Sequence, residues 1–207
     1  MKKNIILFLI FLILPNFSLA CDKEDFLKFV SAGKKKCIAL QTIGKIERNK
    51  KNLIIFLHGD LSSGAKPPGK KGYWKLGNEL LSDNVNFFFL ARPGYTLDSG
   101  RKSYGSYKET RKAKTNYKWE KLELVAKAAQ NLKEHYNANN LIMIGHSGGA
   151  LTSAIINSRV PKLIDKSILI SCPCDFEKWR KMRGESIYKM KTSPHKNISG
   201  ISKDSHT

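Results

Sequence analysis

The chain has 207 residues, with 37 Lys and Arg against 17 Asp and Glu, and its formal net charge is +20 at pH 7. A basic balance suits a nucleic-acid or anionic membrane partner, but 30 of the basic residues are Lys, only 7 are Arg, and they are spread along the whole chain. Because Arg is the residue that recognises bases and phosphates with two parallel hydrogen bonds, this composition argues against specific nucleic-acid recognition. The length fits a single α/β domain.

The N-terminus has the layout of a secretory signal peptide. The chain opens MKKNIILFLIFLILPNFSLAC, which gives two lysines, an apolar stretch and a small-residue end at Ala20. The apolar run is about ten residues, short of the roughly 20 that span a bilayer. We therefore expect 1–20 to be removed, 21–207 to form one domain, and the mature protein to be periplasmic or secreted. The alternatives are an N-terminus retained as a membrane anchor and a lipid-modified Cys21, either of which would associate the protein with the cell envelope.

Downstream, short apolar runs alternate with longer amphipathic segments. Buried strands are expected at 53–57, 85–90, 141–144 and 167–170, after an edge strand within 38–47. Helices are expected around 77–82, at 117–136, where apolar residues recur at helical spacing, and at 147–157. Surface loops are expected at 61–73 and 96–116. Continuous apolar strands separated by helices predict an α/β fold with a mostly parallel sheet flanked by helices.

The four cysteines are Cys21, Cys37, Cys172 and Cys174. Export would bring them into an oxidising compartment, where Cys21 and Cys37 could close a short loop; two unpaired thiols are the alternative. One proline separates Cys172 from Cys174, and we expect this spacing to be too tight for an easy mutual disulfide. Two cysteines with no histidine at a ligand spacing cannot complete a zinc site. We therefore expect no metal. We also expect no cofactor, because the dinucleotide-binding pattern G-x-G-x-x-G is absent from the sequence.

The stretch 141–154 reads LIMIGHSGGALTSA and places Gly145-His146-Ser147-Gly148-Gly149 between a strand and a helix. The pattern G-x-S-x-G in this context is typical of a nucleophile elbow. Glycines on either side of the serine remove β-carbons that would collide as the helix packs on the strand. The helix N-terminus directs N–H groups toward the hydroxyl, so the Gly148 N–H is a candidate for half of an oxyanion hole. The alternative is a tight turn with an N-cap serine.

On these residues the chain resembles the α/β-hydrolase superfamily, and two further stretches agree. Leu57-His58-Gly59-Asp60 follows the strand 53–57 as the HG loop of that family does, and Arg92-Pro93-Gly94-Tyr95 follows the next strand like its RPGY turn. The resemblance covers about 38–185. It implies a serine hydrolase fold in which the N–H of Asp60 or Leu61 completes the oxyanion hole.

The acid of a serine triad is left open by this resemblance. In the family the acid usually follows the strand after 167–170, and the histidine follows the last strand. The tail SPHKNISGISKDSHT shows no apolar strand, so we expect the sheet to lack the last two strands. Asp175 follows the strand 167–171, where some family members carry the acid. Its alternative is an N-cap for the helix that begins at Phe176.

The base is harder to assign. By resemblance His58 belongs to the oxyanion loop, His146 is the variable residue of the elbow, and His135 is expected to be exposed on its helix. His195, expected in an unstructured tail, is the remaining candidate base.

Two hypotheses of different kinds follow. The first is an exported serine hydrolase that acts on small ester, thioester or peptide substrates, with weak or no activity because the triad histidine is missing. The second is a non-catalytic, truncated remnant or binding module of the same fold. In both, the sheet ends at an apolar strand whose open edge predicts self-association, or a partner that covers it.

Overall fold

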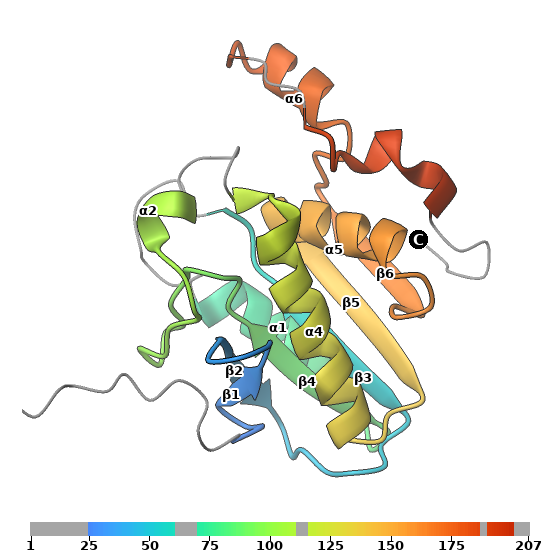
Figure 1. Cartoon of the computed structure of the whole chain (residues 1–207). Helices are drawn as coiled ribbons and strands as arrows, with labels where there is room; N and C mark the ends of the chain where they lie inside the picture. Colours follow the sequence, from blue (N-terminus) through green and yellow to red (C-terminus); the bar gives the residue numbers. More distant parts are fainter. Residues whose placement is uncertain (1–24, 61–69, 111–115, 187–189, 201–207) are drawn as a thin grey trace, which may run out of the picture.

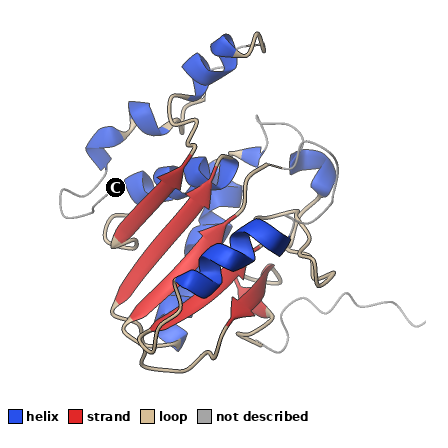
Figure 2. Cartoon of the chain, turned by 180° about the vertical axis from the view of Figure 1, so that it is seen from behind, coloured by secondary structure: helices blue, strands red, loops and turns tan. Residues whose placement is uncertain are grey.

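The computed structural model describes residues 25–60, 70–110, 116–186 and 190–200. They form a layered α/β structure in which one sheet lies between α1 on one face and α4 and α5 on the other (Figures 1 and 2). The strands are β1 (Phe29–Ser31), β2 (Cys37–Ile43), β3 (Asn52–Leu57), β4 (Val85–Leu90), β5 (Asn140–His146) and β6 (Lys166–Ile170). The helices are α1 (Lys70–Glu79), α2 (Tyr107–Thr110), α4 (Trp119–His135), α5 (Gly148–Arg159) and α6 (Phe176–Met182), followed by the short 3-10 helices η1 (Pro194–Lys196) and η2 (Ile198–Gly200).

The sheet has six strands in the order β1-β2-β4-β3-β5-β6. Strands β4, β3, β5 and β6 are parallel, whereas β1 and β2 are antiparallel additions on the β4 side. This confirms the prediction of a mostly parallel sheet flanked by helices. The strand expected within 38–47 forms as β2, but it is not the edge, because β1 pairs along its outer side.

Each parallel strand is apolar on both faces because both faces are covered. Leu53, Ile55 and Leu57 of β3 belong to the core beneath α4 and α5, whereas Ile54 and Phe56 belong to the core packed against α1. Alternate residues of a strand point to opposite faces, so one apolar run supplies both cores. At the β6 edge this cover is incomplete: Ile168 is 49 % exposed and Ile170 is 37 % exposed.

Three connecting segments differ from the sequence expectations. Of the loop expected at 61–73, residues 61–69 lie outside the described residues, and the rest belongs to α1, whose Tyr73, Trp74 and Leu76 pack on the sheet. The segment 96–116 contains α2 and a bridge between Thr96 and Lys102. The tail after 190 is not structureless, since it forms η1 and η2.

The prediction for Cys172 and Cys174 is wrong. They form a disulfide with their Cα atoms 5.1 Å apart, inside the range that disulfides span, because the turn after β6 brings the two side chains together. Cys37 is disulfide-bonded as well, whereas Cys21 and the expected signal peptide at 1–20 lie outside the described residues. None of the helices in the described ranges is long and apolar enough to cross a membrane.

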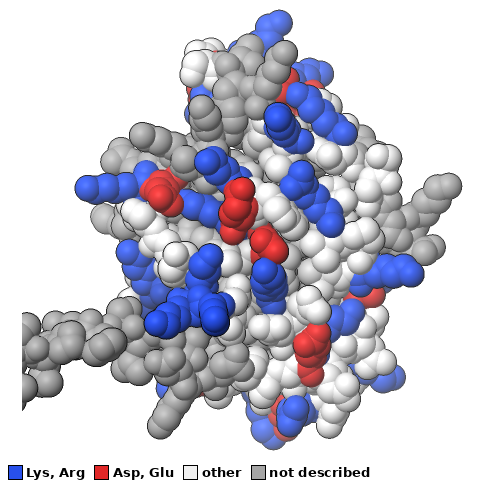
Figure 3. All heavy atoms as spheres, viewed as in Figure 1, with Lys and Arg blue, Asp and Glu red and all other residues white. Residues whose placement is uncertain are grey.

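The basic side chains are dispersed. Figure 3 shows Lys and Arg spread over the face that carries α4, with acidic side chains between them and without one continuous basic patch.

Candidate active site

Ser147 lies at the turn where β5 ends and α5 begins, and its backbone is strained. Its φ is 51° and its ψ is −113°, in a region that residues other than glycine rarely adopt. The neighbouring glycines leave no room for side chains: a β-carbon on Gly145 would lie 2.5 Å from the backbone of Ala150, and one on Gly149 would lie 2.1 Å from the Leu57 carbonyl oxygen. The turn is therefore as tight as the sequence pattern predicts.

The Ser147 backbone is anchored on both sides. Its N–H donates to the Ile170 carbonyl of β6 at 2.8 Å, and its carbonyl accepts from the Leu151 N–H at 3.0 Å as α5 begins. Its hydroxyl, in contrast, makes no hydrogen bond to any residue that the structure describes. The hydroxyl is thus carried on a firmly anchored backbone.

The loop after β3 passes against this turn. A β-carbon on Gly59 would lie 3.1 Å from His146 Nδ1 and 3.2 Å from the Ser147 β-carbon. This close approach puts Asp60 beside the elbow, where the second half of an oxyanion hole is expected. Leu61 lies outside the described residues.

His58 has a structural task in this loop. It is 1 % exposed, its Nδ1 lies 2.7 Å from the Gly59 carbonyl oxygen, and its Nε2 lies 3.2 Å from the Arg92 backbone nitrogen. Burial, together with the charge of Arg92, lowers the pKa of His58 to about 3. The ring is therefore neutral, with Nδ1–H donating to Gly59 and Nε2 accepting from Arg92, and it has no free nitrogen with which to act as a base.

The Asp60 carboxylate is the centre of a polar network beside the elbow. It accepts hydrogen bonds from Arg92 Nη2, Tyr117 OH at 2.6 Å, Asn116 Nδ2 at 3.0 Å and Tyr95 OH at 3.1 Å. Burial raises the pKa of Asp60, but the charge of Arg92 and these hydrogen bonds outweigh it, so the net pKa is lowered. The side chain keeps 44 % of its surface exposed, which also favours the carboxylate.

Arg92 extends this network to the elbow itself. The side chain is buried, and its Nη1 donates to the Gly148 carbonyl at 3.2 Å and lies 3.4 Å from Thr152 Oγ1. Burial alone would lower the pKa of Arg92, but the neighbouring Asp60 carboxylate raises it by more. The net pKa is raised, so the guanidinium stays charged. The sequence marks Arg92 only as part of the Arg92-Pro93-Gly94-Tyr95 turn. The feature of the sequence that could have pointed to it is its position just after β4, the strand that pairs with β3.

No protein-family model matches the sequence, and no curated protein matches it. Solved structures do resemble it. Est1E from Butyrivibrio proteoclasticus, solved with ferulic acid bound, superposes with a TM-score of 0.56 at 16 % identity over 81 % of this chain and 60 % of its own. The Pyrococcus furiosus esterase Pf2001 gives 0.52 at 19 % identity, over 75 % and 56 %. The Mycobacterium smegmatis proline iminopeptidase gives 0.51 at 13 % identity, over 76 % and 47 %.

The chain has the α/β-hydrolase fold. It spans about half to three fifths of the length of these proteins.

Asp175 and His195 lie together in this α/β-hydrolase fold. Asp175 is the N-cap of α6 and accepts from the Lys178 N–H at 3.1 Å, and its Oδ1 lies 3.6 Å from His195 Nδ1. The Ser193 hydroxyl also approaches that nitrogen, at 3.0 Å. Among the described residues no hydrogen bond or ion pair joins this pair to Ser147. The structure therefore brings the candidate acid and base to each other but not to the nucleophile.

The two other described histidines lie away from a base position. His146 Nδ1 lies 2.9 Å from the Tyr73 hydroxyl of α1 and close to Gly59 of the oxyanion loop, so its described hydrogen-bond partner is Tyr73. His135 was expected to be exposed, but it is half-buried, because its ring stacks on Phe26 with centroids 3.6 Å apart.

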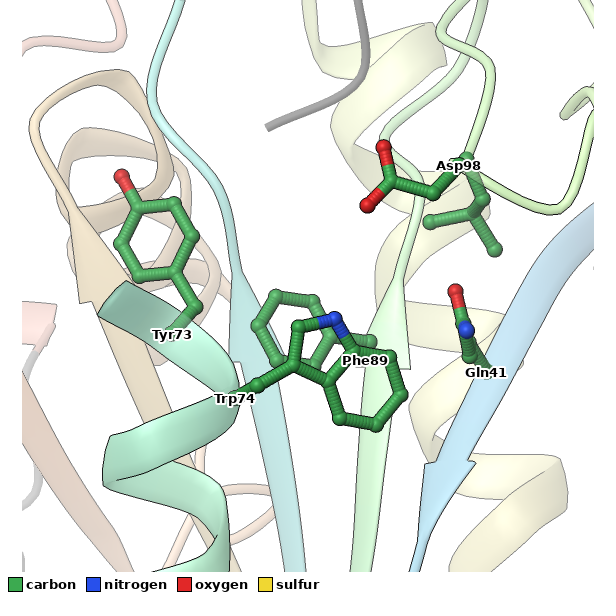
Figure 4. Close-up of a pocket in the computed structure, with 6 residues that line it drawn as sticks. Gln41, Tyr73, Trp74, Phe89 and Asp98 are labelled. Atoms are coloured by element: carbon green, nitrogen blue, oxygen red, sulfur yellow. The ribbon is translucent and has the colours of Figure 1, made fainter. Parts of the chain in front are cut away.

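A hollow on the α1 side of the α/β-hydrolase sheet is too small to be the substrate site. Trp74 stacks on Phe89 there, and Gln41 and Asp98 lie beyond them (Figure 4). Its volume is ≈ 10 Å³, which holds about one water molecule.

Proposed function

We propose that the protein is an exported serine hydrolase of ester, thioester or peptide bonds, with Ser147 as the nucleophile. The observation that carries the proposal is the strained serine at φ 51° between β5 and α5, with Gly59 against it. Such a turn presents a hydroxyl above the carboxyl edge of the sheet. The oxyanion donors are the Gly148 N–H at the start of α5 and an N–H of the loop at Asp60 or Leu61.

The reaction would proceed by acyl transfer. Ser147 Oγ attacks the carbonyl carbon and gives up its proton, the carbonyl oxygen becomes an oxyanion held by the two N–H groups, and the alcohol, thiol or amine leaves with a proton. Water then releases the acid from the acyl-serine. The similar structures include esterases and a proline iminopeptidase, which supports this broad range of substrates.

The base limits the proposed rate. The Asp175–His195 pair has the order of a triad, with the carboxylate on the Nδ1 side and Nε2 left for the nucleophile. Because nothing described links it to Ser147, we expect slow turnover that rests mainly on the elbow and the oxyanion hole, which alone give some acceleration in other triad enzymes.

The test is labelling by an active-site-directed fluorophosphonate, together with hydrolysis of a nitrophenyl acetate. We expect labelling that is lost in Ser147→Ala and weak esterase activity. His195→Ala should slow labelling further if the pair supplies the base, whereas the matched control His135→Ala should not. Turnover at ordinary enzyme rates in His195→Ala would contradict the assignment of His195.

A second candidate is a non-catalytic binding module of the same fold. It is favoured because, among the residues that the structure describes, none forms a hydrogen bond with the Ser147 hydroxyl that would activate it as a nucleophile. Complete absence of labelling in a folded sample would select this candidate and reject hydrolysis.

A further inference from the structure

The polar network beside the elbow joins three separate loops. Asp60 follows β3, Arg92 follows β4, and Gly148 follows β5, so all three lie at the carboxyl edge of adjacent parallel strands. The Arg92 side chain is only 3 % exposed. It bonds to the carboxylate of Asp60 and, through Nη1, to the carbonyl of Gly148 at 3.2 Å. A buried guanidinium with two such partners cross-links the oxyanion loop to the elbow.

Gly148 is the residue that this cross-link fixes. Its carbonyl accepts from Arg92 and also from Thr152 Oγ1 at 2.9 Å. On its other side there is no free space, because a β-carbon there would lie 2.3 Å from Tyr117 OH and 2.6 Å from Asp60 Oδ1. The carbonyl and the Cα of Gly148 are therefore held by contacts on both sides, and this restrains the N–H carried by the same residue, which is the proposed oxyanion donor.

The same contacts bring a negative charge close to the proposed oxyanion. The Asp60 carboxylate packs against Gly148 and would oppose a second negative charge forming there. Arg92, paired with that carboxylate, cancels its charge. Loss of Arg92 would thus have two effects: it would free the Gly148 peptide, and it would leave Asp60 uncompensated.

We propose that Arg92 is a positioning residue of the active site, which orients the Gly148 N–H and neutralises Asp60 so that an oxyanion can form beside them. The inference rests on the proposed hydrolase function for its catalytic meaning. Small displacements of a catalytic group cost about a hundredfold in rate, and loss of one oxyanion donor costs a similar factor or more.

The experiment compares Arg92→Met, Asp60→Asn/Arg92→Met and the control Arg101→Met. Arg101 donates to the Leu40 carbonyl at 2.8 Å and lies in another hydrogen-bonding group. We expect the fluorophosphonate labelling rate of Ser147 to fall by at least about tenfold in Arg92→Met, to recover in part in the double variant, and to be unchanged in Arg101→Met. A partial recovery would show that the charge of Asp60 is the cause, because a purely structural role of Arg92 predicts a further fall in labelling rate when Asp60→Asn is added.

A fall in labelling rate of less than about tenfold in folded Arg92→Met would overturn the proposal. If Arg92→Met does not fold, Arg92→Lys, which keeps the charge but loses the two-pronged geometry, takes its place. The same fall in labelling rate is then expected from the lost orientation of Gly148, and no recovery is expected when Asp60→Asn is added.

If the unsubstituted protein is not labelled at all, the proposed hydrolase function fails while the positioning claim can still be tested. The readout is then the amide resonances of Gly148 and Gly149 in ¹⁵N-labelled protein. A shift of both in the Arg92 variant, without one in Arg101→Met, supports the positioning role. Unshifted resonances overturn it.

Discussion

The neutral, buried His58 predicts a specific loss of stability in mild acid. Folding lowers its pKa from 6.5 to about 3, first because of burial and then because of the charge of Arg92. Between these two values the unfolded chain binds a proton that the folded chain excludes. Stability must therefore fall as the pH falls from about 6.5 toward 3, with a slope of about 1.36 kcal/mol per pH unit.

The expected size of this loss follows from the window chosen. Going from pH 7 to pH 4.5 crosses about two pH units below the unfolded pKa, which gives a loss on the order of 2–3 kcal/mol. That is a large part of a total stability of about 5–15 kcal/mol. Asp60, whose pKa is lowered from 3.8, contributes stability that is lost mainly below this window.

The assay is urea unfolding of the purified protein and of His58→Gln at both pH values. The glutamine amide does not titrate, and its oxygen can still accept from the Arg92 N–H. We expect the difference in unfolding free energy between the two proteins to shrink by roughly 2–3 kcal/mol from pH 7 to pH 4.5. A difference that stays constant across that range would show that the proton on His58 is not excluded by folding, and the reasoning would be refuted.

Three other predictions follow from separate features. Asp175→Ala should lower the unfolding free energy by about 1 kcal/mol through loss of the α6 N-cap, while Asp175→Asn should lose little; equal melting curves for all three proteins would contradict the cap. The open edge of β6 should make the protein self-associate in size-exclusion chromatography, and Ile168→Lys should shift it toward monomer, because an exposed edge charge opposes pairing; a monodisperse unsubstituted monomer would count against this. N-terminal sequencing of the exported protein should begin near Cys21, and recovery of intact Met1 from the cell envelope would favour the anchor instead.

The sheet was predictable because its strands are buried on both faces. The apolar runs that form β3, β4, β5 and β6 are continuous. Such runs are typical of parallel strands that helices cover on both faces. The elbow was predictable because the backbone passes so close to Gly145 and Gly149 that only glycine fits there. These two glycines are visible in the sequence as part of the G-x-S-x-G pattern.

The network around Asp60 left no comparable trace. Its four donors are 32 to 57 residues away from Asp60 in sequence, and charged or hydroxyl side chains at such distances carry no periodic signal. The Cys172–Cys174 disulfide was misjudged because it depends on local turn geometry and not on spacing alone. The pairing of Asp175 with His195 depends in turn on how the segment after 190 folds back onto α6.

The strained backbone at Ser147 has a consequence for how this chain can evolve. Glycine adopts a positive φ at little energetic cost, whereas a side-chain-bearing residue held there costs about 1–3 kcal/mol. Natural proteins sit only slightly above the stability they require, so a lineage with no use for the hydroxyl would gain from Ser147→Gly and would be expected to drift toward it. Comparison of the melting temperatures of the unsubstituted protein and Ser147→Gly would measure how much stability the glycine adds. The larger the gain from glycine, the stronger the selection for the hydroxyl that would be needed to keep serine in its place.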